Sequence, residues 1–310
     1  MVDRNELEPR LQHGTIGGVR ILLGLMWLAN LHWKVAPRFG EDNGAGLYKY
    51  VAEAEVNAPF APFRWIVDHI VLPQYQLFGW FTLVSESVVA ALLLIGYRTR
   101  EVALLGAGLS VSIFLSVIYY PRADEWSWAY FMMIGLHLLV AAVAAGDHVG
   151  VDGVLAGPRA ARNRALTTLG VVGVVVGVLG LFVARSVDFA GRQAALLGSD
   201  AGFADGDRIV RRWELKFLWF NPLWALLTIA GGALLIAGAK QVVAAWAGAS
   251  WFAALAIIIF ISQTFDYARD DGNIQVVGTG SNFAFWGALA TGAAVLTWRQ
   301  SQTTGADVQP

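Results

Sequence analysis

The 310-residue chain contains no cysteine. It therefore has no thiol to form a disulfide, to act as a nucleophile, or to bind zinc or an iron–sulfur cluster, and it has no CxxCH motif for haem attachment. We expect no Cys-based site of any kind. Any redox chemistry of this chain has to use a bound organic molecule or a partner subunit.

Charge is also scarce. Asp, Glu, Lys and Arg make up only 15% of the residues, and lysine occurs only at Lys34, Lys49, Lys216 and Lys240. Because the sequence has no basic cluster and no nucleic-acid-binding motif, we expect no nucleic acid partner. Hydrophobic residues make up 56% of the chain, and the mean hydropathy is +0.54. This composition predicts a multi-pass membrane protein in contact with membrane lipids.

Eight apolar runs are long enough to cross a bilayer, the first as an uncleaved anchor. The short connections after the second and fourth runs hold five arginines, whereas those after the third and seventh hold Arg122 and Arg269. Because positive charge is enriched on the cytoplasmic side, both termini are predicted to be cytoplasmic. We therefore expect an all-α polytopic membrane protein with eight transmembrane helices, at about 14–35, 75–96, 102–120, 127–146, 165–185, 219–238, 247–266 and 280–298.

The two halves of the chain show an internal repeat. Ile113–Ser116 (IFLS) matches Ile259–Ser262 (IFIS), and Ala91–Gly96 (ALLLIG) matches Ala233–Gly238 (ALLIAG). Four spans are an even number, so the two halves would have the same orientation in the membrane. We expect two tandem four-helix bundles, a degenerate parallel repeat over residues 1–156 and 157–300, followed by a disordered tail over 301–310.

The connection over residues 36–74 is longer than a link requires. Two stretches within it, Leu47–Glu55 and Phe60–Val71, have the apolar spacing of amphipathic helices on the outer membrane surface. Such helices form either a roof over the first bundle or a passive interfacial anchor, and the sequence leaves both interpretations open.

Glu86 lies in the middle of the apolar run 75–96, ~15 Å along the helix from either end. An ionisable group at that depth costs roughly 2.5–3.5 kcal/mol on insertion scales. A residue placed at such a cost usually has a function or a charged partner.

His137 is predicted to lie at nearly the same depth as Glu86, because both follow the outer ends of their spans by a similar number of residues. A Glu–His pair can relay a proton or bind a quinone carbonyl, so these two residues are the candidate catalytic groups. Arg20, in the first span, is a candidate ligand-binding residue that can also neutralise Glu86 or reach the inner face. The alternative is a purely structural network that pairs Glu86 with Arg20 and His137 with Ser110, Ser112 or Ser116.

Further candidate ligand-binding residues lie toward the outer end of the first span, at Trp27, Asn30 and Lys34. Asn30 and Lys34 are four residues apart and share one helix face. Interfacial anchoring remains an alternative role for Lys34. His32 does not match the depth of His137, so a pair of axial haem ligands is not expected, and no metal site is predicted.

Three motifs over residues 14–155 give the chain a resemblance to a known family. They are Arg20–Gly24 (RILLG) with Trp27 and Lys34, Glu86 with Leu92–Arg100 (LLLIGYRTR), and Gly146–Asp152 (GDHVGVD). In this combination the sequence resembles the DoxX/DoxD-like integral membrane proteins, which include the membrane subunit of thiosulfate:quinone oxidoreductase. The second half lacks counterparts of Glu86 and of the last two motifs.

The resemblance implies a multi-pass protein of a prokaryotic cell membrane. It further implies a subunit of a quinone-linked oxidoreductase, with sulfur-compound oxidation as a candidate reaction, a quinone or similar lipophilic molecule bound in the first bundle, and a partner subunit. Arg98 and Arg100 of the second motif join the candidate ligand-binding residues. The alternative is a non-catalytic assembly factor, chaperone or cargo-binding scaffold. Nothing in the sequence points to an oligomeric state.

Overall fold

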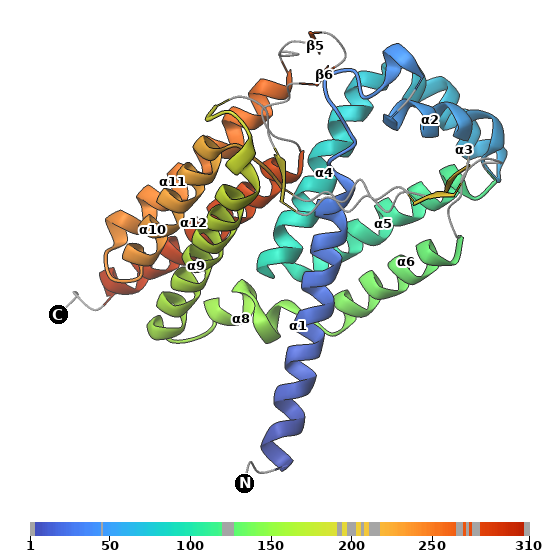
Figure 1. Cartoon of the computed structure of the whole chain (residues 1–310). Helices are drawn as coiled ribbons and strands as arrows, with labels where there is room; N and C mark the ends of the chain where they lie inside the picture. The colour runs from blue at the N-terminus through green and yellow to red at the C-terminus, as the bar shows by residue number, and fades with distance from the viewer. Residues whose placement is uncertain are drawn as a thin grey trace.

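The computed structural model describes residues 4–44, 46–119, 127–190, 194–196, 203–205, 208–210, 218–264, 269–270, 273–274 and 280–306. Within these ranges the chain is almost entirely helical, as predicted (Figure 1). A long helix occupies the position of each predicted span. These helices are α1 (Arg4–Asn30), α4 (Tyr75–Ile95), α5 (Thr99–Val117), α6 (Ser127–Ala142), α9 (Arg159–Val183), α10 (Pro222–Gly238), α11 (Val242–Thr264) and α12 (Gly280–Ala306).

Four helical stretches in the described part of the chain are long and apolar enough to cross a membrane: Ala61–Ile95, Thr99–Val117, Arg159–Ser186 and Val242–Ser262. Two further apolar helices, α6 and α10, are shorter, with 16 and 17 residues. The structure thus confirms a mainly helical protein with several helices of membrane-spanning length, as the composition predicted. Helix α12 continues to Ala306, into the stretch expected to be a disordered tail, and residues 307–310 lie outside the described residues.

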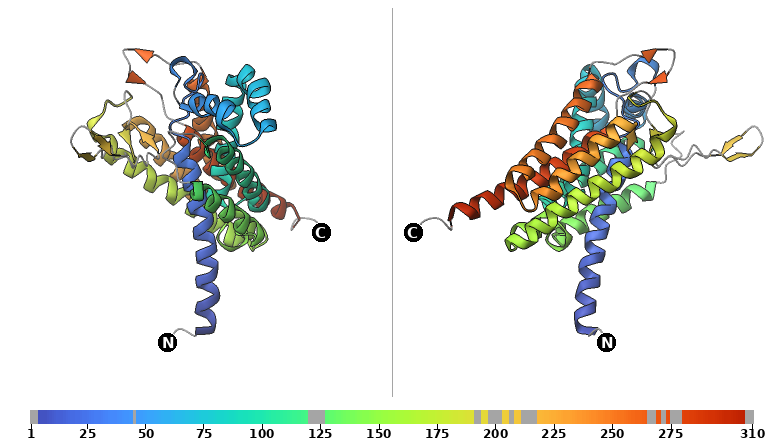
Figure 2. Two further views of the ribbon diagram at one scale, coloured as in Figure 1. Left: turned by 90° about the vertical axis from the view of Figure 1, so that its right-hand side faces the viewer. Right: turned by 60° about the vertical axis from the view of Figure 1, so that its left-hand side comes forward.

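The long helices form two groups (Figures 1 and 2). The first group has α1 and α4 in the centre of the molecule and α5 paired with α6 on one side, and the second group, α9 to α12, packs together on the other side. Helix α12 connects the groups, because it contacts both α4 and α9. The described residues also contain the 3₁₀ turns η1 (Glu41–Asn43) and η4 (Ala184–Ser186). Six short strands among them form antiparallel pairs: β1 (Ala194–Ala195) with β4 (Trp219–Phe220), β2 (Phe203–Asp205) with β3 (Arg208–Val210), and β5 (Arg269–Asp270) with β6 (Asn273–Ile274).

The connection before α4 is helical, as its apolar spacing predicted. Helix α2 (Gly46–Asn57) buries Leu47, Val51 and Ala54, which lie on one face at helical spacing. The second amphipathic stretch is not separate from the span that follows it: α3 (Ala61–Ile66) continues through a π turn, η2 (Val67–Val71), and a 3₁₀ turn, η3 (Leu72–Gln74), into α4. Pro73 has no N–H to donate, so the regular hydrogen-bond pattern gives way locally to these turns without ending the helix.

The turn between α4 and α5 contains a left-handed glycine. Gly96 has φ +67°, and its N–H and that of Tyr97 both donate to the carbonyl oxygen of Leu92. This is the usual end of a helix at glycine. Arg20 from α1 satisfies further carbonyl oxygens at this end: its Nη1 donates to Leu93 at 2.5 Å and Leu94 at 3.2 Å, and its Nη2 donates to Val149. The cation therefore caps the negative end of α4.

Asp152 completes the same turn from the other side. The short helices α7 (Gly146–Val149) and α8 (Val151–Leu155) follow α6, and they carry this carboxylate to the start of α5. It accepts hydrogen bonds from the N–H groups of Arg98 (2.9 Å) and Thr99 (3.1 Å) and from the Thr99 hydroxyl (3.0 Å). Its own N–H donates to the Gly96 carbonyl oxygen at 2.9 Å. A Cβ added at Gly146 would lie 2.2 Å from the Thr99 hydroxyl oxygen, so this position needs glycine. We call this meeting of Arg20, Gly96, Thr99, Gly146 and Asp152 the inner junction.

The inner junction gives the first prediction. Asp152→Ala removes the acceptor that caps α5, and loss of such a cap costs about 0.5–2 kcal/mol. We expect a lower melting temperature in detergent, measured by circular dichroism. Asp147→Ala is the matched control, because Asp147 is an exposed acid on the neighbouring α7. Equal melting temperatures for the two variants would show that the cap contributes nothing.

Candidate functional site

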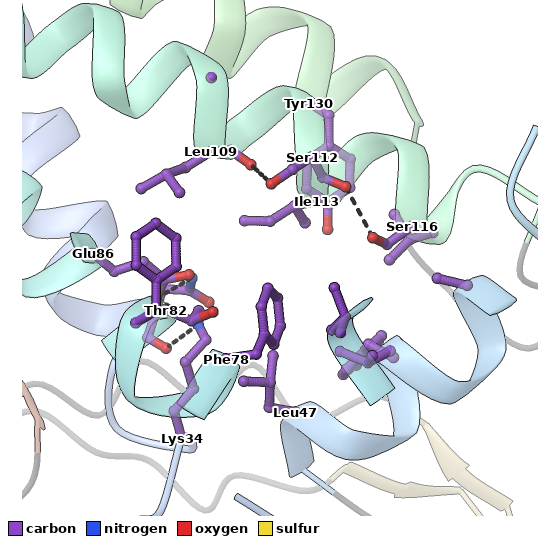
Figure 3. A pocket seen from close by; sticks show the side chains of 18 of the residues that line it. Lys34, Leu47, Phe78, Thr82, Glu86, Leu109, Ser112, Ile113, Ser116 and Tyr130 are labelled. Atoms are coloured by element: carbon purple, nitrogen blue, oxygen red, sulfur yellow. Dashed lines mark hydrogen bonds and ion pairs between the residues drawn. The ribbon is translucent and has the colours of Figure 1, made fainter. Parts of the chain in front are cut away.

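A cavity of about 1490 Å³ lies between the C-terminal end of α1, helices α2 and α3, and helices α4, α5 and α6 (Figure 3). We use the name roof for α2 and α3 together, because they cover this cavity. Its walls are mostly apolar and aromatic, with Phe78 of α4, Leu109 and Ile113 of α5 and Met133 of α6 among them. Polar groups line three parts of the cavity. Lys34, Thr82 and Glu86 lie at one end with Asn30 beside them, and Ser112, Ser116 and Tyr130 lie along the α5–α6 wall. The third part is formed by His32 with Lys49 and Tyr50 of α2.

The charged end of the cavity is a buried ion pair. Lys34 Nζ lies 2.6 Å from Glu86 Oε2, and the two side chains are only 2% and 1% exposed. Nζ also donates to the Asn30 carbonyl oxygen at 3.1 Å and lies 4.2 Å from the centre of the Trp33 ring. The Asn30 amide nitrogen approaches the same Glu86 oxygen at 3.4 Å, and the Trp33 indole donates to Asn30 Oδ1 at 3.1 Å.

These contacts compensate for the cost of burial. Two charges withdrawn from water lose several kcal/mol of hydration each, which their attraction offsets only when further hydrogen bonds surround them. Lys34 ends the turn that follows the end of α1 at Asn30, where its N–H donates to the Leu31 carbonyl oxygen, and its side chain reaches Glu86 in the middle of α4. The alternative that pairs Arg20 with Glu86 is therefore wrong, because Lys34 is the partner of Glu86 and Arg20 binds carbonyl oxygens at the inner junction.

His137 lies beside the cavity without lining it. The Trp27 indole donates to His137 Nε2 at 2.8 Å, and His137 Nδ1 lies 2.7 Å from the Met133 carbonyl oxygen. Because an indole N–H only donates, Nε2 is the acceptor, and the ring proton is on Nδ1. A Cβ at Gly106 would lie 2.5 Å from this ring, so the glycine makes room for it. In this arrangement the imidazole is neutral and positions Trp27 in the cavity wall.

The predicted pairing of Glu86 with His137 does not occur among the described residues, which link each of them to other groups. The three serines proposed for His137 bind carbonyl oxygens of their own helix instead: Ser110 that of Gly106, Ser112 that of Leu109 and Ser116 that of Ser112.

The cavity brings together four of the predicted site residues: Trp27, Asn30, Lys34 and Glu86. Arg98 and Arg100 are exposed at the opposite end of α4, where Arg98 Nε is 3.8 Å from Glu101. Sequence reasoning did not identify Thr82, which precedes Glu86 by one helical turn and shares its face, although that spacing was visible. It also missed Phe78 and the α5–α6 wall, because no signal in one sequence shows which faces of separate helices meet.

The ion pair gives the second prediction. Lys34→Met leaves the Glu86 carboxylate buried without its cation, and breaking a buried pair costs roughly 3–5 kcal/mol in soluble proteins. We expect a large fall in melting temperature, with partial recovery in Lys34→Met combined with Glu86→Gln. Arg38→Met is the control, because the Arg38–Asp42 pair is also 2.6 Å long but is 57% and 35% exposed and exposed pairs contribute at most about 1 kcal/mol. A Lys34→Met protein as stable as Arg38→Met would contradict a stabilising role.

Comparison with known proteins identifies the family. The profile of the family described as "TQO small subunit DoxD" matches residues 17–175, just over half of the 310-residue chain. The matched region includes all of α4, α5 and α6, the cavity and the inner junction. No curated protein and no solved structure matches the chain significantly. The chain belongs to the DoxD family.

Proposed function

We propose that this protein is the membrane subunit of a quinone-linked oxidoreductase and that a quinone binds in the cavity of the first bundle. The observation that carries the proposal is a large, mainly apolar cavity that ends on a buried Lys34–Glu86 pair. Binding sites for small apolar molecules typically combine such walls with a few well-placed polar groups. The family description, the small subunit of thiosulfate:quinone oxidoreductase (TQO), supports the same ligand class.

The residues at the charged end fit a quinone ring. Its two carbonyl oxygens are hydrogen-bond acceptors, and the Lys34 ammonium and the Thr82 hydroxyl are donors that reach the cavity. Phe78 and Trp27 offer aromatic surfaces to a flat ring. The quinone, when bound, supplies the capacity to accept electrons. Glu86, hydrogen-bonded and charge-paired through Oε2, is the group that exchanges protons with the ring oxygens.

The electron donor comes from a partner in this proposal. The chain has no cysteine with which to handle sulfur or to hold an iron–sulfur cluster. A subunit docked at the outer surface would oxidise the donor, with a sulfur compound as the first candidate, and the present chain would pass the electrons to the quinone pool.

We further propose that all eight long helices cross the membrane as two parallel-related four-helix bundles. The packing supports a repeat: α1 with α4, α4 with α5, α5 with α6 and α1 with α6 correspond to α9 with α10, α10 with α11, α11 with α12 and α9 with α12. Thr228 aligns with Glu86 in the second half. Its hydroxyl donates to the Trp224 carbonyl oxygen at 2.7 Å and accepts from the Trp286 indole at 3.2 Å, so the second bundle uses this position structurally.

The proposed topology places both termini in the cytoplasm of a prokaryotic cell. The absence of native cysteine makes single-cysteine labelling unambiguous. Val56→Cys and Asp188→Cys are expected to react with a membrane-impermeant maleimide in intact cells. Arg159→Cys is expected to react only after permeabilisation. The reverse pattern would overturn the orientation, and labelling of Val56 and Asp188 from opposite sides would overturn the parallel repeat.

The quinone proposal predicts the behaviour of Glu86→Gln. Wild-type protein purified from native membranes is expected to carry bound quinone. Solvent extraction would release this quinone, and mass spectrometry would detect it. Glu86→Gln loses the charge-assisted bond that holds the Lys34 ammonium in place to donate to the ring oxygen. Loss of a hydrogen bond to a charged group costs about 1.5–3 kcal/mol, so the variant should bind quinone roughly 10- to 100-fold more weakly. Glu101→Gln is the control, because Glu101 is exposed on α5 and lies outside the cavity.

Three outcomes would contradict the proposal. They are wild-type protein that binds no quinone in reconstituted membranes, a Glu86→Gln protein with unchanged affinity, and recovery of a protein client in place of quinone. The last would favour the alternative role as an assembly factor or cargo-binding scaffold. A melting curve for each variant separates loss of binding from loss of folding.

A further inference from the structure

The cavity is bounded by two helices that diverge. Helices α4 and α5 share the turn of the inner junction, and from there α4 runs toward the roof while α5 runs outward beside α6 (Figure 1). Helix α2 packs against α5 and against η2 and covers the wide end of this V. The space between α4 and α5 is therefore closed at the turn and covered at the wide end, so any opening lies at its sides.

Several residues that line the cavity are strongly exposed. Phe81 of α4 is 60% exposed, and Leu104 and Leu105 of α5 are 55% and 42% exposed. Both helices belong to stretches long and apolar enough to cross a membrane. Because these three side chains both line the cavity and are exposed on helices of membrane-spanning length, they mark an edge where the cavity meets the surrounding hydrocarbon.

Gly108 lies in the middle of this edge. It lines the cavity and is exposed, and a Cβ added to it would have no atom within 4 Å. It follows Leu104 by one helical turn on the same face. Gly108 comes nine residues after Thr99, and Glu86 comes nine residues before Ile95, so both lie ~14 Å along their helices from the shared turn. The gap without a side chain is thus level with the Lys34–Glu86 pair.

We propose that the cavity opens sideways into the lipid between α4 and α5, at Phe81, Leu104, Leu105 and Gly108, and that this opening admits a quinone directly from the membrane. The inference rests on the proposed quinone function and adds the side from which the quinone enters the cavity. The ring lies against Lys34 and Glu86, and the isoprenoid chain passes through the opening and remains in the hydrocarbon. The chain then never has to leave an apolar environment, which removes the main free-energy cost of transferring such a molecule.

A second route would run under the roof, past His32, Lys49 and Tyr50. These residues lie toward the outer face, where an apolar chain would meet water and charged groups. That route suits a short polar molecule and not a long-chain quinone. The two routes therefore make different predictions for a substitution at the lipid-facing edge.

The test uses Gly108→Trp in protein reconstituted into liposomes. The probes are a quinone with a ten-carbon chain and the same ring without a chain, and the measurements are association and dissociation rates and equilibrium affinity. Gly135→Trp is the matched control, because Gly135 on α6 is also exposed, also has no atom within 4 Å of an added Cβ, and does not line the cavity. Tyr50→Ala tests the route under the roof.

We expect Gly108→Trp to slow association and dissociation of the chain-bearing quinone by about tenfold, equivalent to about 1.4 kcal/mol in activation free energy. Its affinity should change much less than its rates, and Gly135→Trp and Tyr50→Ala should match the wild type. Unchanged rates in Gly108→Trp would overturn the lateral opening. Quinone binding by the wild-type protein in the same experiment would still support the proposed quinone function. Faster exchange in Tyr50→Ala would assign access to the roof. Wild-type protein that binds neither probe would instead overturn the quinone function itself.

Discussion

The arrangement of the first bundle depends on how its backbone polar groups are satisfied at the inner junction. In hydrocarbon each unpaired carbonyl or N–H costs several kcal/mol, so the ends of membrane helices need partners from elsewhere in the chain. Arg20 supplies donors to the end of α4, and Asp152 supplies acceptors to the start of α5. These two side chains fix α1 and the segment after α6 to one turn, from which α4 and α5 diverge. The divergence creates the volume that becomes the cavity.

The Lys34–Glu86 pair at the end of the cavity has different surroundings from the inner junction. The inner junction joins charges to backbone groups and leaves no space around them, as the close approach of Gly146 and Gly150 to the Gly96 carbonyl shows. Lys34 and Glu86 instead lie at the end of the cavity, where the proposed quinone would meet them. The family motifs thus serve two purposes: one set of residues builds the bundle, and the other lines the space that the bundle encloses.

Much of this was accessible from the sequence. Apolar runs and the charged turn at Arg98–Glu101 placed each long helix of the first bundle, and the cost of a membrane-buried carboxylate singled out Glu86. The partners of the charged residues were not accessible, because depth in a membrane can be counted along a helix whereas rotation about its axis cannot. Arg20 was the cation considered for Glu86, whereas Lys34, which pairs with it, was considered a ligand-binding residue or an interfacial anchor. His137 lay at the right depth, but its ring accepts a hydrogen bond from Trp27. Asp152 stood in a recognised motif, but its capping role depends on contacts more than fifty residues away.

The uninterrupted run from α3 to α4 has a mechanical consequence. A loop between a surface helix and a membrane helix would absorb a displacement, whereas a continuous rod transmits it. Here the chain passes through the π and 3₁₀ turns at Val67–Gln74, and Gln74 itself departs from helical dihedral angles (φ −124°, ψ 38°). The two helices can therefore meet at a bend, but no loop separates them. A protein that grips α3 from outside would therefore tilt α4 and, with it, the carboxylate of Glu86. In the proposed complex, docking of a donor subunit at α3 would therefore change the position of the Glu86 carboxylate inside the membrane.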